Sequence, residues 1–135
     1  MEKINLENDI RTFCVAADSF PNGVLKAHQT LHSLVPYSNE RKYFGLSRMQ
    51  AGKIEYKAAA EELIPGELSK HGLTDIIIAS GSYQSLLVKD FMKDIDSIGA
   101  AFNKLIQLPD IDPQGYCIEW YLSDKDVRCM VRVVS

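Results

Sequence analysis

One order of predicted elements, strand–helix–strand–strand, occurs twice along the 135 residues of this chain and leaves few architectures open. In the first copy, residues 10–17 predict a strand. Apolar residues at helical spacing then predict a helix from about residue 22 to residue 35, which Pro36 ends. Residues 43–49 and 53–60 predict a hairpin that follows this helix.

The second copy follows a predicted linker at residues 65–72, which is rich in turn-forming and charged residues. Residues 74–80 predict its strand, and an apolar stripe at helical spacing predicts one long helix directly after that strand. Residues 116–122 and 127–134 predict a second hairpin. The stripe consists of Leu87, Phe91, Ile95, Ile98, Phe102 and Leu105.

These two copies predict an α+β fold made of tandem modules. A chain of this length forms one domain, residues 1–135, with pseudo-repeat halves at about 1–64 and 73–135. We expect an antiparallel sheet with both helices on one face. A central cleft between the halves is then the natural place for a ligand.

Composition disfavours direct nucleic-acid binding. Hydrophobic residues make up 46% of the chain, charged residues 24%, and the formal net charge is −3. The chain has no dense cluster of lysine and arginine, and its whole length is used by the elements above, which leaves no room for a helix-turn-helix.

Targeting signals and cysteines predict a cytoplasmic protein without membrane contact. Residues 1–9 are acidic and lack the apolar segment of a signal peptide, and no apolar run has the length of a membrane span. Cys14, Cys117 and Cys129 have no metal-like spacing and lie in apolar strand patterns, so we expect buried free thiols. We expect no metal ion and no cofactor.

A single carboxylate, Glu119, interrupts the apolar strand pattern at residues 116–122. Such surroundings remove its solvation, which costs several kcal/mol unless a partner compensates. Strand alternation places Cys117 and Tyr121 on the same face as Glu119, and Trp120 on the other. Glu119 is therefore either a ligand-binding carboxylate in a pocket, with a pKa raised by burial, or an edge-strand residue that points into water.

Further candidates for the site are aromatic residues and histidines. Tyr121 shares the face of Glu119, whereas Trp120 either packs in the core or lines a pocket on its own side. Tyr83, before the second predicted helix, and Tyr56, on the first hairpin, either line the cleft or have structural roles. His28 and His32 lie four residues apart on the first helix, but no third ligand accompanies them, so we interpret them as solvated histidines.

The tandem order and two short motifs resemble the GyrI-like small-molecule-binding domains, the effector-binding domains of bacterial multidrug-responsive transcription activators. In that family a Gly-Pro-Tyr-like turn precedes the second helix, and Gly81-Ser82-Tyr83 is similar to it, with Ser82 where proline is common. A Glu-x-Tyr pattern on the penultimate strand is matched by Glu119-Trp120-Tyr121. The family's Pro-Ala-Gly-like start of the preceding strand is replaced by Gly72-Leu73-Thr74-Asp75.

The resemblance implies a stand-alone domain with a central cleft for lipophilic, often cationic, aromatic compounds, and Glu119 would take the position of the family's acidic residue at the bottom of that cleft. Some relatives regulate transcription through fused DNA-binding domains, one branch restrains DNA gyrase, and another hydrolyses reactive small molecules.

Three functions follow as hypotheses. The first is capture or sensing of a lipophilic cationic molecule, with a role in transcription regulation or drug response. The second is a hydrolase with Glu119 as general base and a nearby tyrosine as proton donor, which lacks an obvious second carboxylate or histidine in the sequence. The third is an interaction protein that restrains a larger enzyme such as gyrase. Binding without catalysis is the preferred interpretation.

Overall fold

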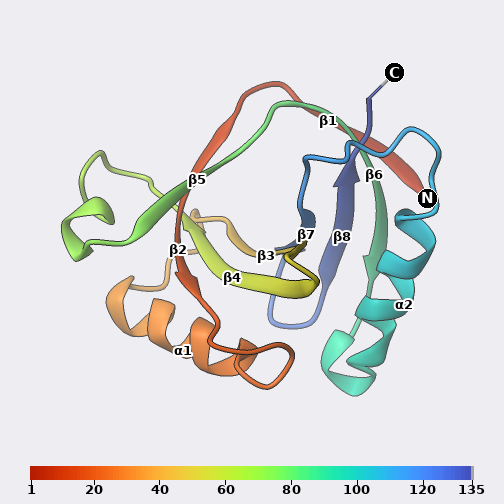
Figure 1. Ribbon diagram of the computed structural model, residues 1–135. Helices are drawn as coiled ribbons and strands as arrows, with labels where there is room; N and C mark the ends of the chain where they lie inside the picture. Colours follow the sequence, from red (N-terminus) through yellow and green to blue (C-terminus); the bar gives the residue numbers. More distant parts are fainter. Residues whose placement is uncertain (135) are drawn as a thin grey trace.

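The chain folds into one antiparallel sheet of eight strands, which curls, with two α-helices packed against it (Figure 1). This computed structural model describes residues 1–134. The strands are β1 (Glu2–Leu6), β2 (Ile10–Ala16), β3 (Tyr43–Gln50), β4 (Lys53–Glu61), β5 (Thr74–Ile78), β6 (Gly81–Val88), β7 (Cys117–Tyr121) and β8 (Val127–Arg132). The helices are α1 (Val24–Leu34) and α2 (Asp96–Leu105), and two short 3-10 turns are η1 (Ser69–His71) and η2 (Phe91–Lys93). The α+β class predicted from the sequence is confirmed.

The strands lie in the order β1-β6-β8-β7-β3-β4-β2-β5, with β3 and β7 at the centre. Outward from β3 come β4, β2 and β5, and outward from β7 come β8, β6 and β1. In chain order, one half contains β2-α1-β3-β4 and the other contains β6-α2-β7-β8. Both halves therefore share one element order, and their origin in a single repeated module stays a prediction.

Both helices pack on the same face of the sheet, as Figure 1 shows. Leu31 of α1 lies in a core cluster with Tyr43, and Leu105 of α2 lies in a cluster with Val127. The strand register pairs Tyr43 with Tyr121 and Tyr121 with Val127, and directly paired residues project from one face. A strip of this face lies between the two helices, and it carries the candidate site.

The other face of the sheet encloses a separate apolar core inside the curl. Two long segments, β1 with β2 and β5 with β6, run side by side and close this curl (Figure 1), because β1 pairs with β6 and β2 pairs with β5. The buried residues of this core are Cys14, Phe44, Leu46, Ala59, Ile78, Tyr83, Ile118 and Met130.

The predicted long helix of the second half is wrong over its first part. Residues 81–88 form strand β6, and α2 begins only at Asp96. Tyr83 and Leu86 lie in the core clusters on opposite faces of the sheet, and β6 pairs with a strand on each side, which satisfies its backbone. The chain then turns at Asp90, whose φ of 51° is incompatible with a continuous helix.

Two strands at the sheet edges also differ from the prediction. Residues 74–80 were predicted to start the second module; residues 74–78 form the edge strand β5, and β6 takes the corresponding place beside α2. The acidic N-terminal segment, for which the sequence predicted no element, forms the opposite edge strand β1. Within residues 1–134, the longest helix has 11 residues, and none is both long and apolar enough to cross a membrane.

Candidate functional site

The strip of sheet between α1 and α2 carries the carboxylate singled out in the sequence. The register places Glu119 of β7 directly opposite Gly45 of β3, and places Ser47 of β3 opposite Tyr56 of β4. All of these residues project from the face on which the helices pack. Because β7 is a central strand between β3 and β8, the edge-strand alternative for Glu119 is wrong.

The two carboxylate oxygens of Glu119 have different surroundings, and the residue is only 9% exposed. Oε1 accepts a hydrogen bond from the Tyr56 hydroxyl at 2.9 Å and a short one from the Tyr121 hydroxyl. Oε2 accepts no hydrogen bond from residues 1–134. Among these residues, the fully buried side-chain nitrogen and oxygen atoms that lack a partner are Arg41 Nε and Arg48 Nε, so Oε2 is not fully buried. A small part of Oε2 therefore reaches the surface and is free to accept a further hydrogen bond.

His28 of α1 joins this cluster, which the sequence interpretation of two solvated histidines missed. Its side chain is half-buried, and Nε2 lies 2.8 Å from the Tyr56 hydroxyl. Because Tyr56 donates its single proton to Glu119, the neutral imidazole must carry its proton on Nε2 and donate to the Tyr56 oxygen. His28, Tyr56 and Glu119 thus form a continuous chain of donors and acceptors. His32 is exposed, as expected, and its ring lies 5.0 Å from that of Tyr43.

Burial shifts the pKa values of Glu119, Tyr56, Tyr121 and His28 in the directions that favour their neutral forms. It raises the pKa of Glu119, although the hydrogen bonds from Tyr121 and Tyr56 partly oppose this shift. Burial and then the charge of Glu119 raise the pKa of Tyr56 and of Tyr121, so both phenols remain donors. Burial, followed by the neighbouring charge of His32, lowers the pKa of His28 to about 4. His28 is therefore neutral at neutral pH.

Gly45 makes the contact between Tyr56 and Glu119 geometrically feasible. A Cβ at this position would overlap the Tyr56 hydroxyl and come within 2.7 Å of Glu119 Oε1. The tyrosine therefore reaches across β3 through space that any side chain would fill. A glycine inside a strand pattern often marks such a close approach, and this was the signal available in the sequence.

Aromatic rings surround the cluster on the helix side. Tyr121 is flanked by His28 from α1 at 5.3 Å and by Phe91 from η2 at 5.6 Å between ring centroids. Phe20, which precedes α1 and is 43% exposed, stacks on Tyr56 with ring centroids 6.0 Å apart. These rings give the carboxylate a largely apolar, aromatic environment with one side near solvent.

Two of the predicted site residues lie on the opposite face of the sheet. Trp120 packs in the inner core, where its ring lies 6.1 Å from that of Phe44. Tyr83 is fully buried in the same core, and its hydroxyl donates to the carbonyl of Ala79 at 2.7 Å. Tyr83 lies within β6 and not at a strand-to-helix turn, so the structure separates both residues from Glu119.

Two surface pockets lie outside this cluster, and Glu119 lines neither. One, of about 290 Å³, is found at the ends of β3 and β7 around Arg48 and Cys117. The other, of about 230 Å³, lies between β2 and α1 around Asp18 and Lys26. Around Glu119 itself, the Tyr56 hydroxyl occupies the space above Gly45.

Comparison with known proteins finds similarity at the level of the fold. No protein-family model and no curated protein sequence matches the chain. An integron cassette protein from the mobile metagenome of Vibrio cholerae superposes with a TM-score of 0.70 at 15% identity, covering 98% of this chain and 95% of that one. A hydrolase from Listeria innocua gives a TM-score of 0.56 at 12% identity, covering 98% and 90%. A second Listeria innocua hydrolase structure gives 0.56 at 11% identity, covering 98% and 91%. At these identities the likeness concerns architecture alone, and the GyrI-like resemblance stays a prediction.

Proposed function

We propose that this protein is a binding domain that captures or senses lipophilic, cationic, aromatic small molecules at Glu119, between α1 and α2. The observation that carries the proposal is the uneven bonding of the carboxylate. Two tyrosine hydroxyls saturate Oε1, whereas Oε2 has no donor among residues 1–134 and retains some exposed surface. A ligand cation can occupy the position beside Oε2.

The charge and the rings both contribute favourably to the binding of a cation. A unit charge about 4 Å from the carboxylate is worth roughly 4 kcal/mol at an effective dielectric near 20. Each aromatic ring that contacts the cation adds about 0.5–2 kcal/mol through cation–π attraction. Tyr56, Tyr121 and Phe20 are the rings placed for this contact.

Access to Glu119 requires a local rearrangement of the aromatic residues. Gly45 provides no side chain beneath Tyr56, so a change of the Tyr56 rotamer opens a hollow directly over β3. Phe20 is the outermost ring of the stack and is 43% exposed. A flat aromatic ligand would therefore enter on the Phe20 side and replace part of the Phe20–Tyr56 stacking.

The test is the affinity for rhodamine 6G, measured by fluorescence polarisation of the dye. Glu119→Gln is expected to weaken binding at least tenfold, about 1.4 kcal/mol, while affinity for the uncharged dye Nile red changes little. Glu7→Gln, at an exposed acidic position, is the matched control. Trp120 lies on the opposite face, so its fluorescence monitors folding and not occupancy. Unchanged rhodamine affinity in Glu119→Gln rules out the proposed mechanism.

A hydrolase acting on a reactive small molecule is the second candidate, because His28 supplies the histidine that the sequence interpretation lacked. In this alternative, Glu119 takes a proton from water, the hydroxide attacks a strained ring carbon, and a tyrosine hydroxyl protonates the leaving oxygen. The chain from His28 through Tyr56 to Glu119 suits such proton movement. The Listeria neighbours are named hydrolases, which fits this alternative at the level of the fold. Turnover of an aryl epoxide that is lost in both Glu119→Gln and Tyr56→Phe would favour it over binding alone.

A protein partner (gyrase or a transcription regulator), a role in transcription regulation or drug response, and a cytoplasmic location remain predictions. The neighbouring acidic residues Glu61 and Glu62, which could contribute to a partner surface, make internal contacts. Glu61 forms an ion pair with Lys42 at 3.7 Å, and Glu62 accepts hydrogen bonds from the backbone amides of Leu68 and Ser69. A supercoiling assay with purified gyrase tests the partner directly.

A further inference from the structure

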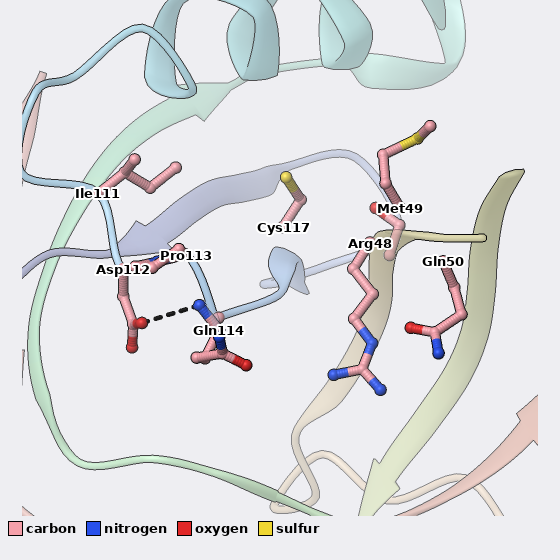
Figure 2. A pocket seen from close by; sticks show the side chains of 10 residues that line it. Arg48, Met49, Gln50, Ile111, Asp112, Pro113, Gln114 and Cys117 are labelled. Atoms are coloured by element: carbon pink, nitrogen blue, oxygen red, sulfur yellow. Dashed lines mark hydrogen bonds between the residues drawn. The ribbon is translucent and has the colours of Figure 1, made fainter. Parts of the chain in front are cut away.

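A second ligand site is indicated by the pocket at the ends of β3 and β7, which we call the β3-end pocket. Its volume is about 290 Å³, close to the lower end for small-molecule sites. Its lining includes Arg48, Gln50 and Gln114 as polar groups and Met49, Ile111 and Cys117 as apolar ones. Figure 2 shows the sulfur of Cys117 and the side chain of Met49 on one side, with the Arg48 guanidinium and Gln114 on the other.

Arg48 differs from every other arginine of the chain. Arg11, Arg41, Arg128 and Arg132 each form an ion pair with a carboxylate. Arg48 forms none with residues 1–134, although Glu55 is its direct cross-strand neighbour.

The environment of Arg48 makes the lack of an ion-pair partner energetically unfavourable. Its Nε is fully buried and has no hydrogen-bond partner among the residues that the structure describes. Its guanidinium lies over the ring of Tyr116, with Cζ 4.5 Å from the ring centroid. This stacking fixes the plane of the guanidinium but satisfies none of its N–H donors. The two terminal Nη groups have no hydrogen-bond partner among residues 1–134 either and are not fully buried, so an acceptor from outside the chain can reach them.

Within residues 1–134, Asp112 is the one carboxylate that lines the β3-end pocket, and it is already neutralised. Asp112 pairs with Arg132 at 3.1 Å and also accepts a hydrogen bond from the backbone amide of Gln114 at 2.9 Å. Among the lining residues of the pocket, Arg48 therefore carries the one charge that has no ion-pair partner within residues 1–134. An anion is the ligand class that this charge selects, and a planar carboxylate matches the fork of a guanidinium.

We propose that the β3-end pocket binds a small molecule bearing a carboxylate, which pairs with Arg48. The amide side chains of Gln50 and Gln114 lie at the polar side of the pocket and can donate to the same group. The apolar body of the ligand packs against Ile111, Met49 and Cys117. The volume restricts this body to about the size of one aromatic ring.

This site is independent of the proposed capture of cations at Glu119. Cys117 and Glu119 project from the same face of β7 two residues apart, which is roughly 7 Å along a strand. Glu119 nevertheless does not line the β3-end pocket. A negative binding result at one site therefore does not affect the proposal for the other site. The variants used to test the β3-end pocket do not alter Glu119.

The experiment titrates the ¹⁵N-labelled protein with benzoate, benzamide and phenyl phosphate and follows amide shifts by NMR. Benzoate is expected to bind in the millimolar range or tighter, with shifts at the ends of β3 and β7, and benzamide at least tenfold more weakly. Arg48→Gln is expected to weaken benzoate binding at least tenfold. Arg48→Lys keeps the charge without the fork and is expected to give an intermediate loss. Arg11→Gln removes an exposed arginine and is the matched control.

Alkylation of Cys117 by iodoacetamide gives a second readout that reports occupancy of the pocket itself. Cys117 is partly exposed, whereas Cys14 and Cys129 are buried. Benzoate is expected to slow its alkylation severalfold in the wild type and not in Arg48→Gln. Three results overturn the proposal: no benzoate binding at millimolar concentration, equal binding of benzoate and benzamide, or unchanged benzoate affinity in Arg48→Gln with a native-like spectrum. Tighter Arg48-dependent binding of phenyl phosphate assigns the pocket to phosphates and also overturns it.

Discussion

Tyr56 of β4 donates a hydrogen bond to Glu119 of β7 at 2.9 Å, although strand β3 lies between their two strands. The contact spans β3 only because Gly45 has no side chain at the crossing point. A residue on the third strand therefore decides whether the other two side chains can meet. This dependence leads to a direct test of the geometry of the site.

Gly45→Ala is expected to destabilise the protein by about 1–3 kcal/mol, because the added methyl group overlaps the Tyr56 hydroxyl. Urea unfolding at neutral pH measures the change. Gly99→Ala, in α2 with open space around its Cβ position, is the matched control and is expected to be neutral or stabilising by up to about 1 kcal/mol. Adding Tyr56→Phe to Gly45→Ala should cost less than the two single changes together. Wild-type stability in Gly45→Ala would contradict the contact across β3.

The raised pKa of Glu119 predicts that its contribution to stability decreases as the pH rises. Between the unfolded value near 4.5 and the higher folded value, the folded protein holds a proton that the unfolded chain has released. The favourable term is thus fully present below pH 4.5 and is lost as the pH rises through the folded pKa. Glu119→Gln should be more stable than wild type at pH 8, and this gain should shrink toward pH 4.

Denaturant unfolding from pH 4 to pH 8 measures that dependence. Glu7→Gln is the control and should follow the wild-type profile, since Glu7 is exposed. A Glu119→Gln protein that is less stable than wild type throughout this range would show that the carboxylate is not a net cost at neutral pH.

His28 is expected to have the opposite pH dependence. Its folded pKa of about 4 lies below the ordinary value of 6.5, so the unfolded chain binds an extra proton between these values. The contribution of neutral His28 is fully present above pH 6.5 and is lost as the pH falls through 4, with an upper limit of about 3 kcal/mol. His28→Gln should reduce this slope of the stability profile, to which His32 also contributes because burial lowers its pKa, whereas the exposed His71→Gln should retain it. An NMR titration of the His28 ring checks the pKa directly, and a value near 6.5 contradicts the burial of the ring beside Tyr56.

The sequence was sufficient for those parts of the fold that local patterns determine. Both hairpins were predicted within a few residues, because alternation and turn residues are local signals. Strand β6 was missed because apolar residues of a strand, a turn and a helix happened to fall at helical spacing, and only pairing with β1 and β8 distinguishes them. Strand β1 was missed for the same reason, since an edge strand of mixed polarity depends on its partner.

For the candidate site, too, features set by a single strand could be predicted, whereas features set by contacts between distant segments could not. The shared face of Glu119 and Tyr121 could be predicted, because it depends on the two-residue period of a single strand. Gly45 and His28 could not be assigned, since their positions depend on the register of β3 and on how α1 lies over the sheet. Tyr56 was one of several aromatic candidates in the sequence, and only the register of β3 and β4 shows that it lies beside Glu119.

Glu67 is expected to hold the predicted linker at residues 65–72 against the sheet. Its carboxylate accepts two hydrogen bonds from the buried Arg41, at 2.7 and 3.2 Å, and others from the backbone amides of Leu63 and Ile64. Hydrogen bonding to Arg41 is the main cause that lowers the pKa of Glu67 to about 2. Glu67→Gln should cost about 2–3 kcal/mol at pH 7, because the buried guanidinium loses its countercharge.

The cost of Glu67→Gln should depend on pH in a defined direction. The wild-type contribution is present above pH 4.5 and is lost as the pH falls toward 2, so the difference between variant and wild type should decrease in acid. Urea unfolding at pH 7 and pH 3, with limited proteolysis between residues 65 and 72, measures both stability and local opening. Asp75→Asn removes the exposed ion pair with Arg11 and should change stability by less than about 1 kcal/mol. Equal effects of the two substitutions at pH 7 would mean that Glu67 contributes no more than an ordinary surface ion pair, and that Arg41 does not depend on it.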